Sequence, residues 1–232
     1  YGGAMMGLEG ALYPWRFRLV MLLLAISAMA VSSFFGHSVQ LYQESARQQN
    51  LLAKGRFALE RISRELRQAT PNSVRWGLSG GVECLEFVPI SRSGIYRNLP
   101  LYPKQTNALD VVTVGSDWTA TAGQRLSVYA TLPEHIYQTN QGRTVQLPTQ
   151  TLDDADGNPN TRRLTLPAAT SFVADSPQQR FYLLENPVSF CRVGAQILRY
   201  SGYGFNASQA FPPAAVGQPL LGGLLNESAE FA

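Results

Sequence analysis

The chain has 232 residues, of which 45% are hydrophobic and 15% are charged, with a formal net charge of +3. This length allows one sizeable core. The basic residues are scattered along the chain rather than gathered in a stripe, which argues against nucleic acid as a partner. No CxxC pair and no Cys/His cluster occurs, which argues against a metal site.

An uncharged apolar segment near the N-terminus carries the strongest signal. Residues 19–36 contain no charged side chain, and as a helix they would extend about 27 Å, close to the thickness of a bilayer core. Arg16 and Arg18 precede the segment, and positive charge on that side predicts a cytoplasmic N-terminus with the rest of the chain outside. We therefore predict a membrane anchor. Its residues are expected to include Leu19, Val20, Met21, Leu22, Leu23, Leu24, Ile26, Phe34 and Phe35.

A cleavable signal is the alternative interpretation of the same segment. Arg16 and Arg18, the apolar run and then Ala28-Met29-Ala30 also fit a secretory signal that is cut after Ala30. Both interpretations export the remainder of the chain. They lead to different molecules, an anchored subunit in the first case and a secreted binding or adhesion module in the second. The uninterrupted helical pattern that follows favours the anchor.

A second helical segment continues the first without a linker. Residues 39–69 contain no proline, and apolar or small residues recur in steps of three and four, which predicts an amphipathic helix. Glu60 and Arg64 stand at i,i+4 in the favourable order, and Pro71 ends the pattern. Together the two segments predict a rod of about 75 Å. The stripe expected to pack on a folded domain comprises Leu52, Leu59, Ile62 and Leu66.

The remainder of the chain has the composition of a β-rich domain. Short β-prone runs alternate with glycine- and proline-containing turns. The expected strands are residues 73–76, 84–90, 108–114, 124–129, 144–146, 162–166, 179–185, 188–193 and 196–200. The last three are predicted to form a meander.

One long helix followed by many strands predicts an α+β fold, in which the helix stripe covers one face of an antiparallel sheet. Four segments are expected. They are a short cytoplasmic or leader region at 1–18, a transmembrane segment at 19–36, an amphipathic helix at 37–70 and a head at 71–232 that continues beyond the sequence.

Cys84 and Cys191 are the two cysteines of the chain, and both fall in predicted strands. In an exported protein, two distant cysteines most simply form one disulfide. Such a bridge would close a loop of over 100 residues and contribute about 4–5 kcal/mol in the chain-entropy model. Two buried free thiols are the alternative.

The sequence offers no pattern for catalysis. His37 and His135 are its two histidines; neither has a motif partner, and no GxSxG occurs. Residues 153–158 resemble a calcium loop, but the first ligand position holds Leu152 and no acidic residue follows nearby. We expect a hairpin turn there. No catalytic, cofactor-binding or metal-binding residue is predicted, and the chain is not expected to be an enzyme.

Three stretches of the chain resemble a known family. Residues 56–69 are similar to the helix end of the large minor pseudopilins, the J-type and PilW-like group of type IV pilin-like proteins. Residues 71–75 with 84–90, and residues 180–183 with 187–191, resemble the MshO proteins of the mannose-sensitive haemagglutinin (MSHA) pilus system. The family's Gly-Phe start and the glutamate that follows it have no counterpart in residues 10–19.

The resemblance implies a structural subunit involved in type IV, MSHA-type pilus biogenesis. It implies a single-pass protein of the bacterial inner membrane, with a cytoplasmic N-terminus and a periplasmic head, that can enter the pilus. The partners it implies are other pilin-like subunits, inner-membrane pilus assembly components, membrane lipid and prepilin peptidase. No cofactor is implied.

Overall fold

A computed structural model describes residues 9–112, 119–155, 157 and 160–221. The chain divides into two compact units, Tyr1–Lys54 and Gly55–Ala232. We call the second unit the head. The boundary between the units falls inside the segment predicted as one amphipathic helix, residues 37–70.

Helix α1 runs from Glu9 to Leu66 and belongs to both units. Beyond its first turns it contains no proline, and Gly36 and Gly55 are its only glycines after residue 10, so the sequence there offers no strong helix breaker. Arg64 lies in the last turn, where a positive charge is favourable. The chain then tightens, with the N–H of Ala69 donating to the carbonyl of Leu66 at 3.0 Å, ahead of Pro71.

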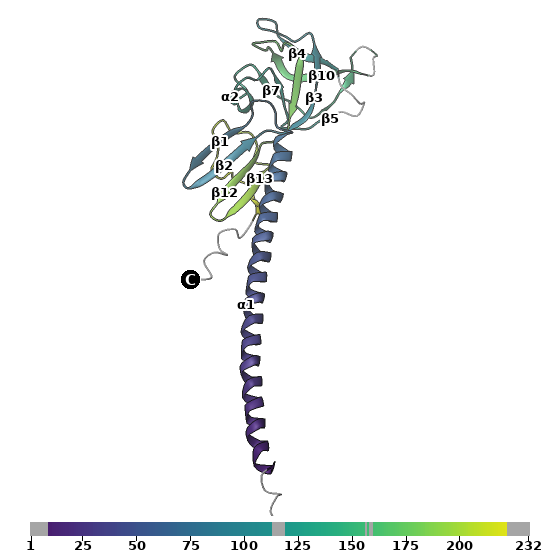
Figure 1. The fold of residues 1–232 in the computed structure, drawn as a ribbon. Coiled ribbons are helices and arrows are strands. Elements are labelled where there is room, and N and C mark those ends of the chain that lie inside the picture. The colour runs from purple at the N-terminus through teal and green to yellow at the C-terminus, as the bar shows by residue number, and fades with distance from the viewer. Residues whose placement is uncertain (1–8, 113–118, 156, 158–159, 222–232) are drawn as a thin grey trace, which may run out of the picture. The chain divides into compact units, whose positions relative to one another are not determined.

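A five-stranded antiparallel sheet forms the part of the head next to the end of α1 in Figure 1. Its order is β1-β2-β12-β13-β14, with bounds Arg75–Ser79, Val82–Phe87, Val188–Val193, Gln196–Ser201 and Gln218–Leu221. Gly80 and Gly81 connect β1 to β2 with φ of +57° and +78°. Two successive positive φ angles suit a tight hairpin between twisted strands, which explains the glycine pair.

A seven-stranded antiparallel sheet forms the other part of the head, in the order β7-β6-β11-β3-β4-β10-β9. Its strands are β3 (Ile90–Arg97), β4 (Thr106–Val112), β6 (Arg125–Val128), β7 (Thr144–Gln146), β9 (Asp153–Asp154), β10 (Thr161–Thr170) and β11 (Arg180–Leu184). Helix α2, Glu134–Tyr137, lies between β6 and β7 in the chain. The short strands β5 (Thr119–Ala120) and β8 (Gln150–Thr151) pair separately.

The largest apolar cluster of the head belongs to the seven-stranded sheet. Tyr96, Leu109, Leu126, Leu164 and Phe181 are buried there together. They come from β3, β4, β6, β10 and β11, at alternating positions that place them on one face. This sheet therefore builds a core with its own strands and loops and does not depend on α1 for cover.

The five-stranded sheet is covered on both faces by other segments. On one face, Phe87, Val188 and Phe190 pack against Ile62 and Leu66 of α1. On the other face lie Cys84, Cys191 and Tyr200, with Tyr203 and Phe211 from the segment after β13 packed against them.

The predicted α+β class is wrong. Strands dominate the described part of the head, and they form three sheets rather than a single sheet beneath a helix. The predicted meander is correct for its last two strands, because β12 and β13 pair, but wrong for the first, because β11 lies in the seven-stranded sheet. The apolar face of β11, with Phe181 and Leu183, is buried in the larger core, and Pro187 interrupts the strand before β12 begins.

The predicted membrane half of the helix is not supported either. Among the residues that the structure describes, no helix combines the length and the apolar character that crossing a membrane requires. This finding overturns the prediction of a single-pass inner-membrane protein.

Candidate functional site

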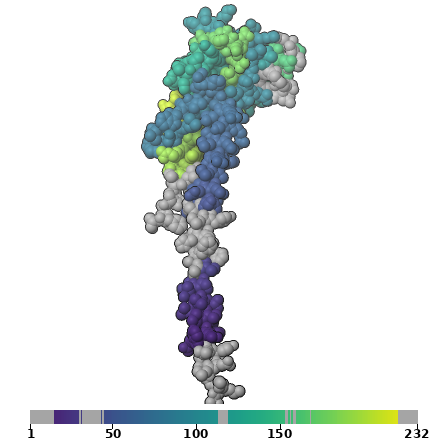
Figure 2. Space-filling view, viewed as in Figure 1, coloured from purple at the N-terminus to yellow at the C-terminus, as the bar shows by residue number. Residues whose placement is uncertain are grey.

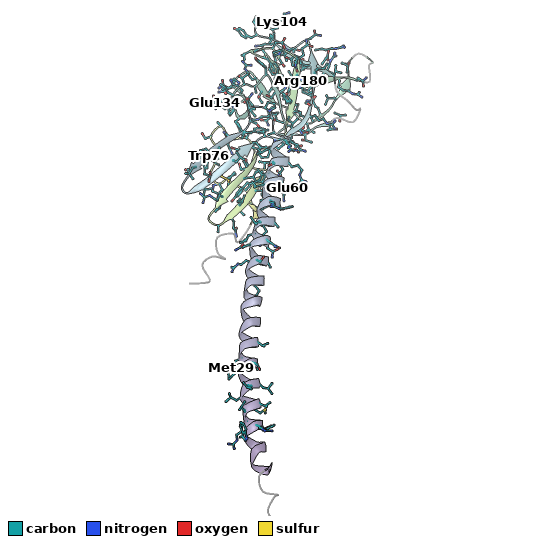
Figure 3. The ribbon with its side chains drawn as sticks, in the orientation of Figure 1. Met29, Glu60, Trp76, Lys104, Glu134 and Arg180 are labelled. Atoms are coloured by element: carbon teal, nitrogen blue, oxygen red, sulfur yellow. A yellow bond between two sulfur atoms is a disulfide. The ribbon has the colours of Figure 1, made fainter. Side chains whose placement is uncertain are left out.

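The apolar stretch of α1 is the most unusual surface in the described part of the first unit. Its large apolar side chains, from Trp15 to Val31, are between 46% and 72% exposed. Ser27 does not interrupt this character, because its hydroxyl donates to the carbonyls of Leu23 and Leu24 in its own helix, at 3.0 Å each. Figure 2 shows these side chains as the purple segment of the surface, and Figure 3 labels Met29 among them.

Most of the predicted anchor residues belong to this exposed stretch. Leu19, with 46% of its side chain exposed, is the most covered of them; the others are Val20, Met21, Leu22, Leu23, Leu24 and Ile26. The side chains of Phe34 and Phe35 lie outside the described residues. A helix that is apolar on all sides is stable when other apolar surfaces cover it. Within the described part of its own unit, no other side chain covers this stretch, so groups beyond those residues would have to bury it.

The predicted helix stripe is divided between buried and exposed positions. Ile62 and Leu66 are partly buried against Phe87, Val188 and Phe190. Leu59 is 66% exposed and Leu52 is 62% exposed. The sequence pattern predicted that Leu59 is the buried residue one turn before Ile62. In the structure that buried residue is Ala58, which is 3% exposed. A small side chain at Ala58 suits close packing of the helix on the head.

An ion pair fixes the end of α1 on the five-stranded sheet. Arg199 of β13 donates from Nε to both carboxylate oxygens of Glu65, at 2.9 and 3.2 Å. Arg61, one turn earlier on α1, also donates to Glu65 at 3.3 Å. Each side chain of the Glu65–Arg199 pair is 20% exposed. Because the pair is partly desolvated, it holds the helix in register on β13 more firmly than an exposed pair would.

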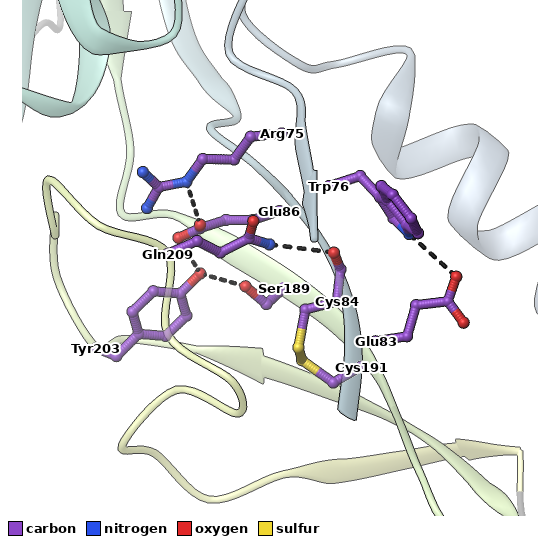
Figure 4. The surroundings of a disulfide bond; sticks show 9 residues. All are labelled: Arg75, Trp76, Glu83, Cys84, Glu86, Ser189, Cys191, Tyr203 and Gln209. Carbon is purple, nitrogen blue, oxygen red and sulfur yellow. Dashed lines mark hydrogen bonds and ion pairs between the residues drawn. A yellow bond between two sulfur atoms is a disulfide. The ribbon is translucent and has the colours of Figure 1, made fainter. Parts of the chain in front are cut away.

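The predicted disulfide is confirmed. Cys84 and Cys191 are bonded, they face each other in register on β2 and β12, and both are fully buried. Figure 4 shows the bridge, with Gln209 of the chain that follows β13 beside Cys84. Gln209 of that segment donates from Nε2 to the carbonyl of Cys84 at 3.1 Å. The bridge thus joins the early strands of the head to the late ones.

A buried carboxylate lies beside the disulfide, on the same face of the sheet. Glu86 of β2 is 1% exposed. Arg75 of β1 donates to it from Nε at 2.5 Å, and the hydroxyl of Tyr203 donates to it at 2.9 Å. Since Tyr203 gives its one proton to Glu86, the hydroxyl of Ser189, 2.7 Å away, donates to Tyr203. Figure 4 shows these four side chains together.

Arg75 extends this network into the loop after β13. Its Nη1 and Nη2 donate to the carbonyls of Ala207 and Asn206 at 2.8 and 2.9 Å. Its guanidinium also lies 3.6 Å from the ring centroid of Tyr137, at a cation–π distance. One arginine therefore joins β1, β2, helix α2 and the loop after β13.

The electrostatics of this cluster favour neutral tyrosines. Burial raises the pKa of Tyr203 well above its ordinary value; the hydrogen bond from Ser189 opposes the shift and the charge of Glu86 adds to it. Burial likewise raises the pKa of Tyr137, and Glu86 adds to that effect while Arg75 opposes it. In the neighbouring part of the head, burial lowers the pKa of Arg125 to about 10. The buried carboxylate is thus paired with Arg75 and hydrogen-bonded by a neutral phenol.

Of the two histidines, His135 is the one whose side chain the structure describes. His135 lies in α2, where its Nδ1 accepts from the N–H of Thr131 at 3.2 Å, and the side chain of His37 lies outside the described residues. Within those residues, no cluster of three His, Cys, Asp or Glu side chains could hold a metal ion. Of the predicted turn 153–158, Asp153–Asp154 form β9, while 156 and 158 lie outside the described part.

Sequence reasoning missed the network around Glu86. A signal for it was present, because Glu86 stands between Leu85 and Phe87 in an apolar run, and a buried acid requires a partner. The partners Arg75 and Tyr203 could not be identified in the same way, because they are 11 and 117 residues away.

Comparison with known protein families, with characterised proteins and with solved structures found no match to this chain.

Proposed function

We propose that this chain is a structural subunit of a type IV pilin-like assembly and takes part in the biogenesis of an MSHA-type pilus. Its role is to be built into an assembly rather than to catalyse a reaction. The partners are subunits of the same class, including second copies of this chain, together with pilus assembly components.

One observation carries this proposal. The apolar side chains of α1 between Trp15 and Val31 are 46–72% exposed within their own unit. Burying apolar surface releases roughly 25 cal/mol per Å², so such a helix has a strong tendency to associate. Helices with matching apolar surfaces cover each other by packing side chains into the grooves of their neighbours. A subunit that contributes this helix to a bundle of like helices would bury the apolar surface that is exposed within its own unit.

The head supports a structural role in a second way. The disulfide, the Glu65–Arg199 pair and the Glu86 network all connect segments that are far apart in sequence. They hold the end of α1, β1, β2 and the late strands in one arrangement. A rigid head suits a building block whose contacts with its neighbours must repeat.

Photo-crosslinking between two copies tests the proposal. Two forms of the full chain with different affinity tags are co-expressed, and one of them carries a photoreactive phenylalanine analogue in place of Leu22 or Met29. We expect crosslinked dimers that contain both tags, with the adduct mapping to α1 of the partner copy. The matched control carries the same analogue in place of Tyr102, which is 75% exposed on the head.

The control defines the result that would overturn the proposal. Crosslinking at Leu22 and Met29 no stronger than at Tyr102 would show that the apolar stretch does not pack against like helices. Recovery of the mature native protein with Val31 as its first residue would contradict the proposal as well, because the stretch would then be removed before assembly.

A further inference from the structure

Strand β1 is an open edge of the five-stranded sheet. It pairs with β2 on one side, and on the other side no hydrogen bond from another described segment reaches the backbone of Trp76 or Leu78. Figure 1 shows β1 at the outer side of the head. A strand edge with unpaired N–H and C=O groups is a template for pairing with another chain.

The turn between β1 and β2 determines which backbone groups face this open edge. Its two residues are glycines with positive φ angles, and Ser79 and Val82 flank them in register. Residues that flank a two-residue hairpin turn form a hydrogen-bonded pair, and such pairs alternate with non-hydrogen-bonded ones along antiparallel strands. Ser79 therefore directs its N–H and C=O groups to β2, whereas Trp76 and Leu78 direct theirs to the open edge.

The same two residues expose apolar side chains on one face of β1. Trp76 is 64% exposed and Leu78 is 60% exposed. Figure 4 shows Trp76 and Arg75 on opposite sides of the strand, as expected for neighbouring positions. The Nε1–H of Trp76 donates to Glu83 of β2 at 3.0 Å. The indole therefore leans over its own sheet and leaves the backbone edge of β1 accessible.

The other described edges of the two larger sheets carry features that discourage pairing. Strand β14 contains Pro219, which has no N–H, while β7 has three residues and β9 has two. Short strands and proline are common protections of a sheet edge. Strand β1 has five residues, with no proline, lysine or bulge among them. The unprotected edge is thus also one that exposes two large apolar side chains.

Two copies of β1 are complementary to each other. When they pair antiparallel about Gly77, Trp76 of each copy lies opposite Leu78 of the other, and the outward N–H and C=O groups of both residues are joined. Each indole then packs beside a leucine on the same face of the sheet. Arg75 lies opposite Ser79 of the second copy, and its charge is already compensated within its own head. No like charges therefore face each other along the paired strands.

We propose that β1 is a self-association edge, at which two copies of this chain join their five-stranded sheets by antiparallel pairing about Gly77. Two strands of five residues bury less than the roughly 1,200 Å² of a standard interface. The contact is therefore weak between isolated chains and becomes effective where heads are held close together.

This contact differs from the packing of α1 helices against one another. The last turns of α1 pack on the same sheet, so the pairing reverses their direction in the second copy. The contact is therefore distinct from a bundle of parallel helices, and the inference does not depend on the proposed assembly role.

Disulfide trapping between two copies tests the pairing and its register. Two forms of the full chain with different affinity tags are co-expressed, one with Trp76→Cys and the other with Leu78→Cys, and the cells are treated with copper phenanthroline. Directly opposite residues have Cα atoms about 5.5 Å apart, within the range of a disulfide. We expect a dimer that contains both tags.

Two controls define the background of this trapping. When both forms carry Trp76→Cys, the two cysteines are diagonal neighbours at about 7–8 Å or more, so the yield should be lower by about fivefold or more. Tyr102→Cys combined with Leu78→Cys should also give a low yield, because Tyr102 is 75% exposed but lies outside the five-stranded sheet.

A change of charge at Ser79 provides a second test. In the proposed register this exposed side chain lies opposite Arg75 of the second copy. Ser79→Lys should lower the yield of the mixed disulfide by about threefold or more, because like charges then face each other, whereas Ser79→Glu should not lower it. Ser93→Lys, the same change at an exposed serine of β3, should leave the yield unchanged.

Several results would overturn the proposal. A mixed yield no higher than that of the two controls would exclude this register. An effect of Ser79→Lys that is shared by Ser79→Glu or by Ser93→Lys would show that Ser79 does not face Arg75 of a second copy. Disulfides that join these cysteines to a different protein, without the mixed dimer, would assign the edge to another partner.

Discussion

Glu65, in the last turn of α1, and Arg199, in β13, join the helix to the sheet through two contacts of 2.9 and 3.2 Å. Both side chains are 20% exposed, so water screens the pair only in part. Hydrogen bonds between charged groups contribute about 1.5–3 kcal/mol each. We expect Glu65→Ala to lower the free energy of unfolding by about 1–2 kcal/mol, measured by urea denaturation, because Arg199 then loses its carboxylate.

The matched control for this change is Glu60→Ala, an exposed glutamate on the same helix. Its effect should stay within about 0.5 kcal/mol, as is usual for exposed positions. A double-mutant cycle with Arg199→Ala should give a coupling energy of about 1 kcal/mol. A coupling near zero would mean that the pair does not hold the helix to β13.

The Glu86 network should be far more sensitive than an exposed ion pair of similar composition. Glu86 is buried between Arg75 and Tyr203. Removing one partner of a buried pair leaves the other charge without compensation and costs about 3–5 kcal/mol. We expect that loss for Glu86→Ala in urea unfolding. The control is Glu83→Ala in the same strand, whose pair with Arg192 is exposed and should contribute about 1 kcal/mol or less.

The way α1 packs on the head can be tested at two adjacent positions. Ala58 is 3% exposed and Leu59 is 66% exposed. Enlarging a side chain in a packed site costs about 1–3 kcal/mol, so Ala58→Leu should lower the free energy of unfolding by that amount. Leu59→Ala should change it by less than about 0.5 kcal/mol. The opposite order of effects would show that the stripe runs through Leu59, as the sequence pattern predicted.

This pair of positions also explains why periodicity alone misplaced the stripe. Leu59 and Ala58 both stand at helical spacing from Ile62, and the pattern favoured the larger apolar residue. Ala58 is the buried one, one turn before Ile62, which packs against Phe87, Val188 and Phe190. These three residues lie at least 25 residues from Ile62 in the chain, so no local pattern could have shown which helix positions they cover.

Some strands could be predicted from the local sequence, whereas others depend on residues that are distant in the chain. The pattern placed β12 at residues 188–193, because Gly194 and Pro187 bound an apolar run. It missed β3, whose sequence contains Arg92, Ser93 and Gly94 and has the composition of a turn. Gly94 is required there, because a Cβ at this position would lie 2.5 Å from the carbonyl oxygen of Val112 and 2.8 Å from the ring of Phe181. A glycine in a strand marks such a close approach, but its neighbours are known only from the fold.

Of the candidate sites, the disulfide could be predicted and the polar clusters could not. The two cysteines had one possible intramolecular pairing, so export was enough to predict the bond. Arg75, Glu86 and Tyr203 come from β1, β2 and the segment after β13. Arg97 and Arg163 become neighbours only because Asp110 lies in register with both. Register between distant strands is set by the whole sheet, which a linear pattern does not contain.

Tyr96 predicts how the head responds to alkaline pH. Burial, together with the hydrogen bond that its hydroxyl donates to Asp175, raises the pKa of Tyr96 to about 12. An unfolded tyrosine ionises near pH ~10, so the folded state holds this proton more tightly than the unfolded state does. The contribution of Tyr96 to stability is therefore fully present below about pH 10 and is lost as the pH rises to about 12.

Urea unfolding measured at several pH values between about 9 and 12 tests this response. The decline in the free energy of unfolding should be shallower in Tyr96→Phe than in the unsubstituted chain, because the variant has no phenol to ionise at that position. Tyr102→Phe, at a residue that is 75% exposed, should keep the original decline. Identical slopes in all three proteins would show that Tyr96 does not hold its proton more tightly in the folded state than in the unfolded state.

The disulfide should account for a large part of the stability of the head. Cys84 and Cys191 are separated by 107 residues, and closing a loop of that length restricts the unfolded chain by about 4–5 kcal/mol in the chain-entropy model. The double variant Cys84→Ala, Cys191→Ala should therefore unfold at markedly lower urea concentration. Because both sulfurs are buried, dithiothreitol should reduce the bond only as the head unfolds. Adding it should destabilise the unsubstituted chain and leave the double variant unchanged; equal stability of the oxidised chain and the double variant would contradict a stabilising role of the bridge between β2 and β12.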